Sequence, residues 1–447
     1  MDFISRASKD FCEIIKEEEK PIRIISHIDT DGITSVAILA KCLKRLNLRY
    51  WITNLKRFDA EELEKILEEA KEDKWNTLII LDFGLDKVKL DSLNELGKNV
   101  FILDHHIIPY EASRLLREGK YKRISLVNQR IYSKDEISTA GLAYLFCKVI
   151  SRENKDLAYI ALIGILGDLQ KIPSFCREIL EDAVETRKII VRKGIQILRS
   201  RLPLQKALEY SDFYIPDVSN SQKGSRELLR QANIPLKEGR IYRTFIDLTD
   251  EEILRLVTLI AIRTPVTFEE LIGEIYLINI KGTLYSMREI GAIVNSCGRV
   301  GRYEEGIEAC YGKIDSAEKN YTRYRKELLS SLRWIEKNIK MNSSYIHDYN
   351  GALIINARNN IRDTLIGVTL SMINPLYEKK VLVGLAYSDD NKIKVSLRSS
   401  EINSRELLER VCHDLGCEYG GHERAAGCLL EREQEDIFIN RLLNELR

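Results

Sequence analysis

The chain has 447 residues, of which 44% are hydrophobic and 31% charged, with a formal net charge of +1. This balance is typical of a globular protein with about two to four domains; it excludes long disordered stretches and by itself neither indicates nor excludes a nucleic-acid partner. No uncharged stretch is long enough to cross a bilayer and the nine cysteines contain no Cys-x-x-Cys pair, so we expect a cytoplasmic protein without a disulfide framework.

The first part of the chain alternates β-rich runs with helical patterns. In the helical stretch 60–73, Leu63, Ile66 and Leu67 recur at the spacing of one helix face. Ser138 begins a further helical pattern, and another runs over residues 156–166. Such alternation predicts an α/β fold with a parallel sheet and helices on both faces. The expected strands are residues 21–26, 77–81, 99–103 and 123–127.

The later part of the chain divides into three sections. We expect basic helices over residues 182–208 and then a middle α/β section. Residues 315–340 contain neither Gly nor Pro, which predicts a long connecting helix. A small C-terminal α/β domain follows, with expected strands at 352–355, 380–387 and 392–398 and helices at 362–373 and 404–415. The expected divisions are 1–210, 211–314, 315–340 and 341–447.

Acidic and histidine residues follow the expected strands. Ligands of open α/β sheets bind beyond the carboxyl ends of the strands, so these side chains are expected to meet. Four carboxylates and two imidazoles in one place would repel and shift each other's pKa unless cations neutralised them. A lone His-x-Asp-x-Asp-Gly or Asp-Phe-Gly motif is more often an ordinary turn, and Asp104-His105-His106 alone fits a turn and a metal site equally well, but the conjunction of the three motifs indicates a metal site. Its members are His27, Asp29, Asp31, Asp82, His105 and Asp168.

We expect two divalent cations at this site. Paired metals in phosphoryl-transfer sites lie about 3.5–4 Å apart and share a ligand. Asp82, the only acid of the middle motif, is the expected bridge. Mixed imidazole and carboxylate ligands favour Mn over Mg, with Mg or Co as substitutes.

A second group of residues lies near the C-terminus. Gly420, Gly421 and His422 suit close approach to a phosphate, and Arg398 is placed to join them. The alternatives are a strand–helix turn with small packing residues and a surface cation. The residues Cys412, His413, Cys417, His422 and Cys428 have a spacing that matches no familiar zinc pattern, so no zinc site is predicted.

These motifs resemble those of the DHH phosphoesterase superfamily, specifically the RecJ-like nucleases of archaea. The resemblance rests on residues 27–32, Asp82, Asp104-His105-His106 and Gly167-Asp168 in the first part of the chain. Residues 420–427, with Arg398, resemble the DHHA1 substrate-binding domain. The resemblance implies a DHH catalytic domain over residues 1–210 and a DHHA1 domain over residues 341–447.

The resemblance also implies a role for each matching residue. One metal would take His27, Asp29 and Asp82, and the other would take Asp31, Asp82, His105 and Asp168. His106 would contact the scissile phosphate, and Asp104 would orient His105. The terminal nucleotide of the substrate would be held by Arg398, Gly420, Gly421 and His422.

Three functions are compatible with this resemblance. The leading one is a metal-dependent exonuclease that acts from an end of single-stranded DNA or RNA, in DNA repair or replication. A second is a hydrolase of short oligonucleotides, 3′-phosphorylated nucleotides or cyclic dinucleotides. A third is a scaffold bound to a helicase, which the presence of all six metal ligands disfavours. The expected partners are single-stranded nucleic acid and a repair helicase or replisome protein docking on residues 219–312, with no membrane.

Overall fold

The structure is a computed structural model with two compact units along the chain, Met1–Tyr321 and Thr322–Arg447. Each unit is described separately. The described residues are 2–133, 135–168, 172–199, 201–211, 215–219, 221–264, 266–374, 377, 380–388, 391–417 and 419–446.

The first unit contains a five-stranded parallel sheet with strand order β2-β1-β3-β4-β5. Because β2 lies on one side of β1 and β3 on the other, the connection reverses direction beside β1, and such switch points are where ligands bind in open α/β sheets. The strands are β1 (Ile22–His27), β2 (Tyr50–Leu55), β3 (Thr77–Leu81), β4 (Asn99–Leu103) and β5 (Ile124–Val127).

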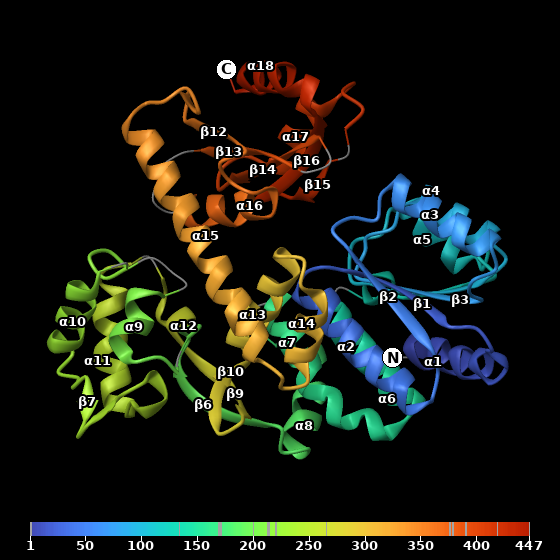
Figure 1. The fold of residues 1–447 in the computed structure, drawn as a ribbon, viewed down its shortest axis with the longest axis horizontal. Coiled ribbons are helices and arrows are strands. Elements are labelled where there is room, and N and C mark those ends of the chain that lie inside the picture. The colour runs from blue at the N-terminus through green and yellow to red at the C-terminus, as the bar shows by residue number, and fades with distance from the viewer. Residues whose placement is uncertain are drawn as a thin grey trace. The chain divides into compact units, whose positions relative to one another are not determined.

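Helices cover both faces of this sheet, as the sequence predicts (Figure 1). On one face, Val100 and Ile102 of β4 belong to a core shared with α3 (Ala60–Lys71), α4 (Lys87–Glu95) and α5 (Tyr110–Arg117). On the other face, Phe101 meets Phe11 of α1 (Asp2–Ile14) and Phe146 of α6 (Thr139–Ile150), with ring centroids 5.1 and 6.3 Å apart. Alternate residues of one buried strand therefore serve two cores.

Two further helices complete the second face. Helix α2 (Thr30–Arg45) packs against α6 and against α7 (Ala158–Asp168). All of its first eleven residues are buried. The helix that begins beside two of the candidate ligands is therefore an interior element of the unit.

The prediction of basic helices over residues 182–208 is wrong for residues 189–195, which form a strand. Helix α8 (Arg177–Glu185) ends early, and β6 (Ile189–Ile195) pairs antiparallel with β9 (Ile272–Ile280), which pairs with β10 (Thr283–Ser286). The β-branched run Ile189–Val191 favours a strand. Arg192 and Lys193, which suggested a solvated helix, are instead exposed on this strand.

The middle section has its own apolar core. It contains α9 (Leu204–Glu209), α10 (Gln222–Gln231), α11 (Asp250–Ala261), α12 (Phe268–Leu271) and the short strands β7 (Lys237–Glu238) and β8 (Ile241–Tyr242). After β10, helix α13 (Met287–Arg299) packs against α7 and α2, and α14 (Tyr303–Cys310) packs against α13. Short 3₁₀ helices lie at Ile15–Glu17, Gln129–Ile131, Arg152–Leu157, Ser174–Cys176, Phe245–Asp247 and, in the second unit, Arg432–Gln434.

The long helix α15 (Asp315–Lys340) runs along the chain from the first unit into the second, as predicted. The second unit is built on a six-stranded sheet with order β11-β12-β13-β14-β16-β15. Helix α16 (Asp363–Ile373) packs on β13 and β14, while α17 (Ser404–Cys412) and α18 (Glu435–Glu445) share a core with the sheet (Figure 1). The strands are β11 (Ile346–Tyr349), β12 (Ala352–Arg358), β13 (Val381–Tyr387), β14 (Lys392–Ser399), β15 (Tyr419–His422) and β16 (Ala425–Glu431).

Among the helices that the structure describes, none combines the length and the apolar character needed to span a membrane.

Candidate metal centre

The ends of three strands and of two helices bring the six predicted ligands together. His27 is the last residue of β1, Asp82 directly follows β3, and His105 lies two residues beyond β4. Asp29 and Asp31 stand at the start of α2, and Asp168 is the last residue of α7. The ligand atoms fall into groups within which every pair lies less than 4.8 Å apart.

The first group consists of His27, Asp29 and Asp82. His27 Nδ1 lies 2.9 Å from Asp29 Oδ2 and 3.6 Å from Asp82 Oδ2. Asp29 is also the N-cap of α2, where its Oδ1 accepts a hydrogen bond from the backbone N–H of Gly32 at 3.1 Å. Capping the helix with one oxygen fixes the carboxylate and leaves the other directed toward His27.

The second group consists of Asp31, His105 and Asp168. His105 Nε2 lies 3.9 Å from Asp31 Oδ2 and 3.8 Å from Asp168 Oδ2. It also lies 3.5 Å from Asp82 Oδ1. Asp82 thus presents Oδ2 to His27 of the first group and Oδ1 to His105 of the second, which is the placement that a bridging carboxylate requires.

The backbone of Asp82 adopts the left-handed conformation, with φ of 65°. Non-glycine residues rarely occupy this region, and Asp and Asn tolerate it best. The backbone N–H of Asp82 donates to the Leu103 carbonyl at 3.0 Å, and the Thr139 hydroxyl donates to Asp82 Oδ1 at 3.0 Å. These contacts hold a carboxylate that is only 3% exposed at the centre of the site.

The carboxylate of Asp31 is held by the N-terminus of α6. The backbone N–H groups of Thr139 and Ala140 donate to its two oxygens at 2.6 and 2.9 Å. Helix N-termini stabilise negative charge in this way. The sequence predicted that a helix starts at Ser138. It did not predict that the start of this helix would bind Asp31, which precedes Thr139 by 108 residues.

The carboxylates of the group favour positive charge beside them. Burial, and after it the charge of Asp82, raises the pKa of Asp31 well above its ordinary value. Burial alone would lower the pKa of His27 and of His105, but the surrounding carboxylates outweigh it and raise both to about 10. Four carboxylates and two imidazoles in two adjoining groups fit divalent metal ions, which would replace these protons.

The expectation that Asp104 orients His105 is wrong. Asp104 Oδ1 lies 2.7 Å from His106 Nδ1, and Asn128 donates to the backbone carbonyl of His106 at 3.0 Å. Burial alone would lower the pKa of His106, but Asp104 outweighs it and the pKa is raised. His105 is instead held through its backbone carbonyl, which accepts from Arg130 Nε at 2.8 Å.

The four predicted substrate-binding residues belong to the second unit. Arg398, on β14, donates to the Ser371 hydroxyl at 2.8 Å and to the Gly367 carbonyl at 3.1 Å, both on α16. Gly420 and Gly421 lie in β15, which forms a hairpin with β16 and not the strand–helix turn weighed as an alternative. The backbone of His422 pairs with Ala425, which pairs with Arg398, so the three residues form one cross-strand row. The side chain of His422 lies outside the described part of the chain.

The sequence missed one cluster, formed by Cys412, Cys417 and Cys428. Their spacing in the sequence matches no familiar zinc pattern and therefore predicts no site. Spacing is informative only when one turn or loop carries the ligands, and here a helix, a loop and a strand contribute one cysteine each.

Three family models match the chain: the DHH family N-terminal domain over residues 21–165, the DHH-CID domain over 199–266 and the DHHA1 domain over 350–447. An uncharacterized protein of Methanocaldococcus jannaschii is 26% identical over 460 residues, covering 98% of this chain and 96% of that protein. The single-stranded-DNA-specific exonuclease RecJ of Bacillus subtilis is 24% identical over 230 residues, covering 50% of this chain but 27% of that protein.

Solved structures share the fold. RecJ of Thermus thermophilus in complex with Mn²⁺ matches with a TM-score of 0.60 and 17% identity, over 100% of this chain and 55% of that one. CDC45 of Entamoeba histolytica matches with a TM-score of 0.65 and 12% identity, over 99% of this chain and 97% of that one. With both end domains, the intervening DHH-CID domain and the sequence relation to RecJ, the chain belongs to the DHH superfamily and is RecJ-like.

Proposed function

We propose that this protein is a metal-dependent exonuclease that hydrolyses phosphodiester bonds from an end of single-stranded DNA or RNA. The observation that carries the proposal is the position of Asp82, whose two oxygens face two separate ligand groups. A shared carboxylate between two ligand sets is the arrangement of two-metal phosphoryl-transfer sites. The sequence relation to a single-stranded-DNA-specific exonuclease supports the choice of substrate.

In this proposal, His27, Asp29 and Asp82 hold one divalent ion, and the second is held by Asp31, Asp82, His105 and Asp168. When bound, the two ions activate water as the nucleophile and stabilise charge on the phosphoryl oxygens. The mixed imidazole and carboxylate donors favour Mn, with Mg or Co as substitutes.

The remaining polar residues of the centre position the substrate. His106 is 48% exposed, and its Nδ1 faces Asp104, which leaves Nε2 for a phosphoryl oxygen. The buried Asp104 carboxylate favours the charged imidazolium, which stabilises the negative charge that develops on the phosphate. Asp104 is therefore a positioning residue for His106.

In this proposal, the second unit binds the end of the nucleic-acid strand. The terminal nucleotide of that strand is bound by Arg398, Gly420, Gly421 and His422. The proposed domain boundaries are 1–210, 211–314, 315–340 and 341–447. We place the activity in cytoplasmic DNA repair or replication. A helicase or replisome protein, docking on residues 219–312, is the proposed partner.

The test is hydrolysis of a single strand labelled separately at each end, with Mn or with EDTA, by the wild type and by Asp82→Asn. Asn tolerates the left-handed backbone, so the substitution removes charge without adding strain. Release of mononucleotides should require Mn. It should fall at least about 100-fold in Asp82→Asn, since the two cations that would stabilise negative charge on the phosphoryl oxygens lose their shared ligand. Asp217→Asn is the matched control, because exposed Asp217 has φ of 63° and lies outside the candidate centre.

Other results would redirect the proposal. Intact long strands with cleavage of dinucleotides, 3′-phosphorylated nucleotides or cyclic dinucleotides would establish the small-substrate function instead. A failure to cleave any of these substrates would refute the enzymatic proposal and favour a scaffold.

A further inference from the structure

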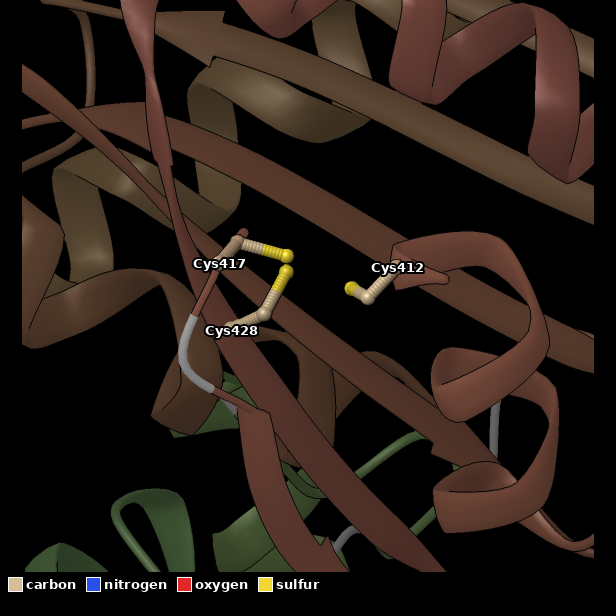
Figure 2. Close-up of side chains that lie close together, drawn as sticks. All are labelled: Cys412, Cys417 and Cys428. Atoms are coloured by element: carbon tan, nitrogen blue, oxygen red, sulfur yellow. The ribbon is translucent and has the colours of Figure 1, made fainter. Parts of the chain in front are cut away.

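Three cysteine thiols of the second unit converge on one point. Cys412 is the last residue of α17, Cys417 lies in the loop before β15, and Cys428 lies within β16. Figure 2 shows the three side chains pointing toward one another, and their sulfur atoms all lie within 4.8 Å of each other. All three are free cysteines.

The surroundings of the three sulfurs are apolar. Cys412 and Cys428 are 3% and 2% exposed and belong to the hydrophobic core of the unit, against which the half-buried Cys417 packs. The neighbouring His413 does not share this environment, because its side chain is 75% exposed and its Nδ1 lies 2.7 Å from Asp414. The convergence therefore consists of thiols, enclosed on the core side and reachable through Cys417.

Convergence of three thiols is explained better by one ion than by a disulfide. A disulfide joins two sulfurs at about 2.05 Å and leaves the third without a function. A tetrahedral zinc ion with Zn–S bonds of about 2.3 Å places its sulfur ligands about 3.8 Å apart. Sulfurs already within 4.8 Å of each other reach that arrangement by small side-chain rotations.

We propose that Cys412, Cys417 and Cys428 bind one thiophilic metal ion, Zn²⁺, as three thiolates. Three Zn–S bonds form and the three S–H protons pass to solvent. Within the described side chains, no further His, Cys, Asp or Glu joins the group. This site is separate from the centre of the first unit, whose nitrogen and oxygen donors suit harder ions.

The ion would link three segments of the second unit. It would tie the end of α17 and the following loop to β16, beside the residue pair Tyr419 and Cys428 of the hairpin. Glycine-rich β15 has few side chains that can pack, so a metal ion coordinated at its start would stabilise the hairpin. The inference does not depend on the proposed nuclease activity.

Cobalt titration of the reduced, metal-free full-length protein tests the proposal. Thiolate-bound Co²⁺ gives a sulfur-to-cobalt charge-transfer absorption that nitrogen and oxygen ligands do not give. We expect this absorption to saturate at one equivalent per chain, to bleach when Zn²⁺ is added, and to persist in Asp82→Asn. Zn²⁺ should also raise the Tm of Asp82→Asn, by the mass action of a ligand that binds only the folded state.

Substitution identifies the ligands. Cys417 is the least buried of the three cysteines, and Cys417→Ser should abolish the charge-transfer absorption. Cys12→Ser should leave the absorption unchanged. Cys12 is a suitable control because it is also half-buried and belongs to none of the ligand groups found among the described residues. If reduced wild type gives no such absorption, or if Cys417→Ser retains it, the proposal fails. Formation of a Cys417–Cys428 disulfide, without cobalt binding after reduction, would overturn it in favour of a redox pair.

Discussion

Arg243 and Glu252 form a bidentate ion pair in the middle section. The Nη1 and Nη2 atoms of Arg243 donate to the two carboxylate oxygens of Glu252 at 2.7 and 2.6 Å, and both side chains are about nine-tenths buried. Hydrogen bonding to Arg243 is the first cause that lowers the pKa of Glu252, to about 2 from 4.5. Glu252 also caps α11 through the backbone N–H of Thr249.

Replacing Glu252 by Gln isolates the charge of this pair, because Gln keeps the capping hydrogen bond. We expect the free energy of unfolding to fall by about 2 kcal/mol near neutral pH, since Arg243 loses its buried partner. A carboxyl whose pKa is lowered by folding stabilises the protein fully above its unfolded pKa of 4.5 and loses this effect as the pH falls toward 2. The difference between wild type and variant should therefore shrink as the pH drops below about 4.5.

Denaturant unfolding at several pH values measures this difference. Glu270→Gln is the control, because Glu270 caps α12 through Thr267 in the same way but is exposed. It should change the free energy of unfolding by less than about 0.5 kcal/mol. A difference for Glu252→Gln that does not vary with pH would show that lost packing, and not charge, is responsible.

At the scale of single residues, sequence reasoning found the candidate ligands but not their supports. His27, Asp82 and His105 were predictable because each ends or closely follows an apolar strand, and parallel strands bring their ends to one edge. The hydrogen bonds from Thr139 and Ala140 to Asp31 were not, since they depend on how two helices pack. Nor could the pairing of Asp104 with His106 be read from three consecutive residues.

Helix α13 approaches the first ligand motif at Gly298, more closely than a side chain there would permit. A Cβ atom added at Gly298 would lie 1.7 Å from the carbonyl oxygen of Ile28, the residue between His27 and Asp29. Gly298→Ala must therefore displace the loop that carries two of the proposed ligands. We expect a loss of about 1–3 kcal/mol in stability, as for other overpacked interiors, together with weaker Mn binding.

Gly291→Ala in the same helix provides the comparison. Its added Cβ would lie 3.4 Å from the nearest atom, the carbonyl oxygen of Ile163, which is an ordinary contact. Since Ala favours helices over Gly by up to about 1 kcal/mol, this variant should be neutral or slightly more stable. Thermal unfolding and Mn titration of both variants decide the matter; equal behaviour would mean that α13 does not constrain the loop.

At the scale of elements, the sequence predicted the buried apolar strand β3 and missed β2 and β6. Strand β3 is a continuous buried apolar run, whereas every residue of β2 is half-buried and its polar and apolar residues do not separate clearly. Strand β6 has four exposed residues in succession, so its basic residues resembled a solvated helix. Exposed strands lack the apolar pattern by which sequence reasoning identifies a strand.

At the scale of the whole molecule, chemistry-bearing residues are unevenly distributed along the chain. The metal motifs lie in the DHH model region and just beyond it, and Arg398 and the glycine pair lie in the DHHA1 region. The DHH-CID region between them supplies none of the candidate site residues. Motifs could therefore predict both ends of the chain, whereas the middle section, built mainly from its own apolar core, offered only length and pattern.

We propose that the second unit binds the strand end and that the first unit cleaves the bond, which predicts a kinetic effect of changing Arg398. Three of its N–H groups donate to Ser371, Gly367 and its neighbour Leu397, which leaves two of the five guanidinium donors for a phosphate within the described structure. Arg398→Lys keeps the positive charge but loses this fixed fork. We expect KM for a labelled single strand to rise about tenfold, equivalent to about 1.4 kcal/mol, while kcat changes less than about twofold.

A small chromogenic phosphodiester separates this role from the chemistry. It engages the metal centre alone, so Arg398→Lys should hydrolyse it as fast as the wild type does. Arg410→Lys, which changes an exposed arginine of α17 paired with Glu445, should affect neither substrate. If Arg398→Lys instead lowers kcat equally on both substrates, the guanidinium acts through the fold and not by holding the strand end. A change in KM confined to the long substrate would place strand binding in the second unit and bond cleavage in the first.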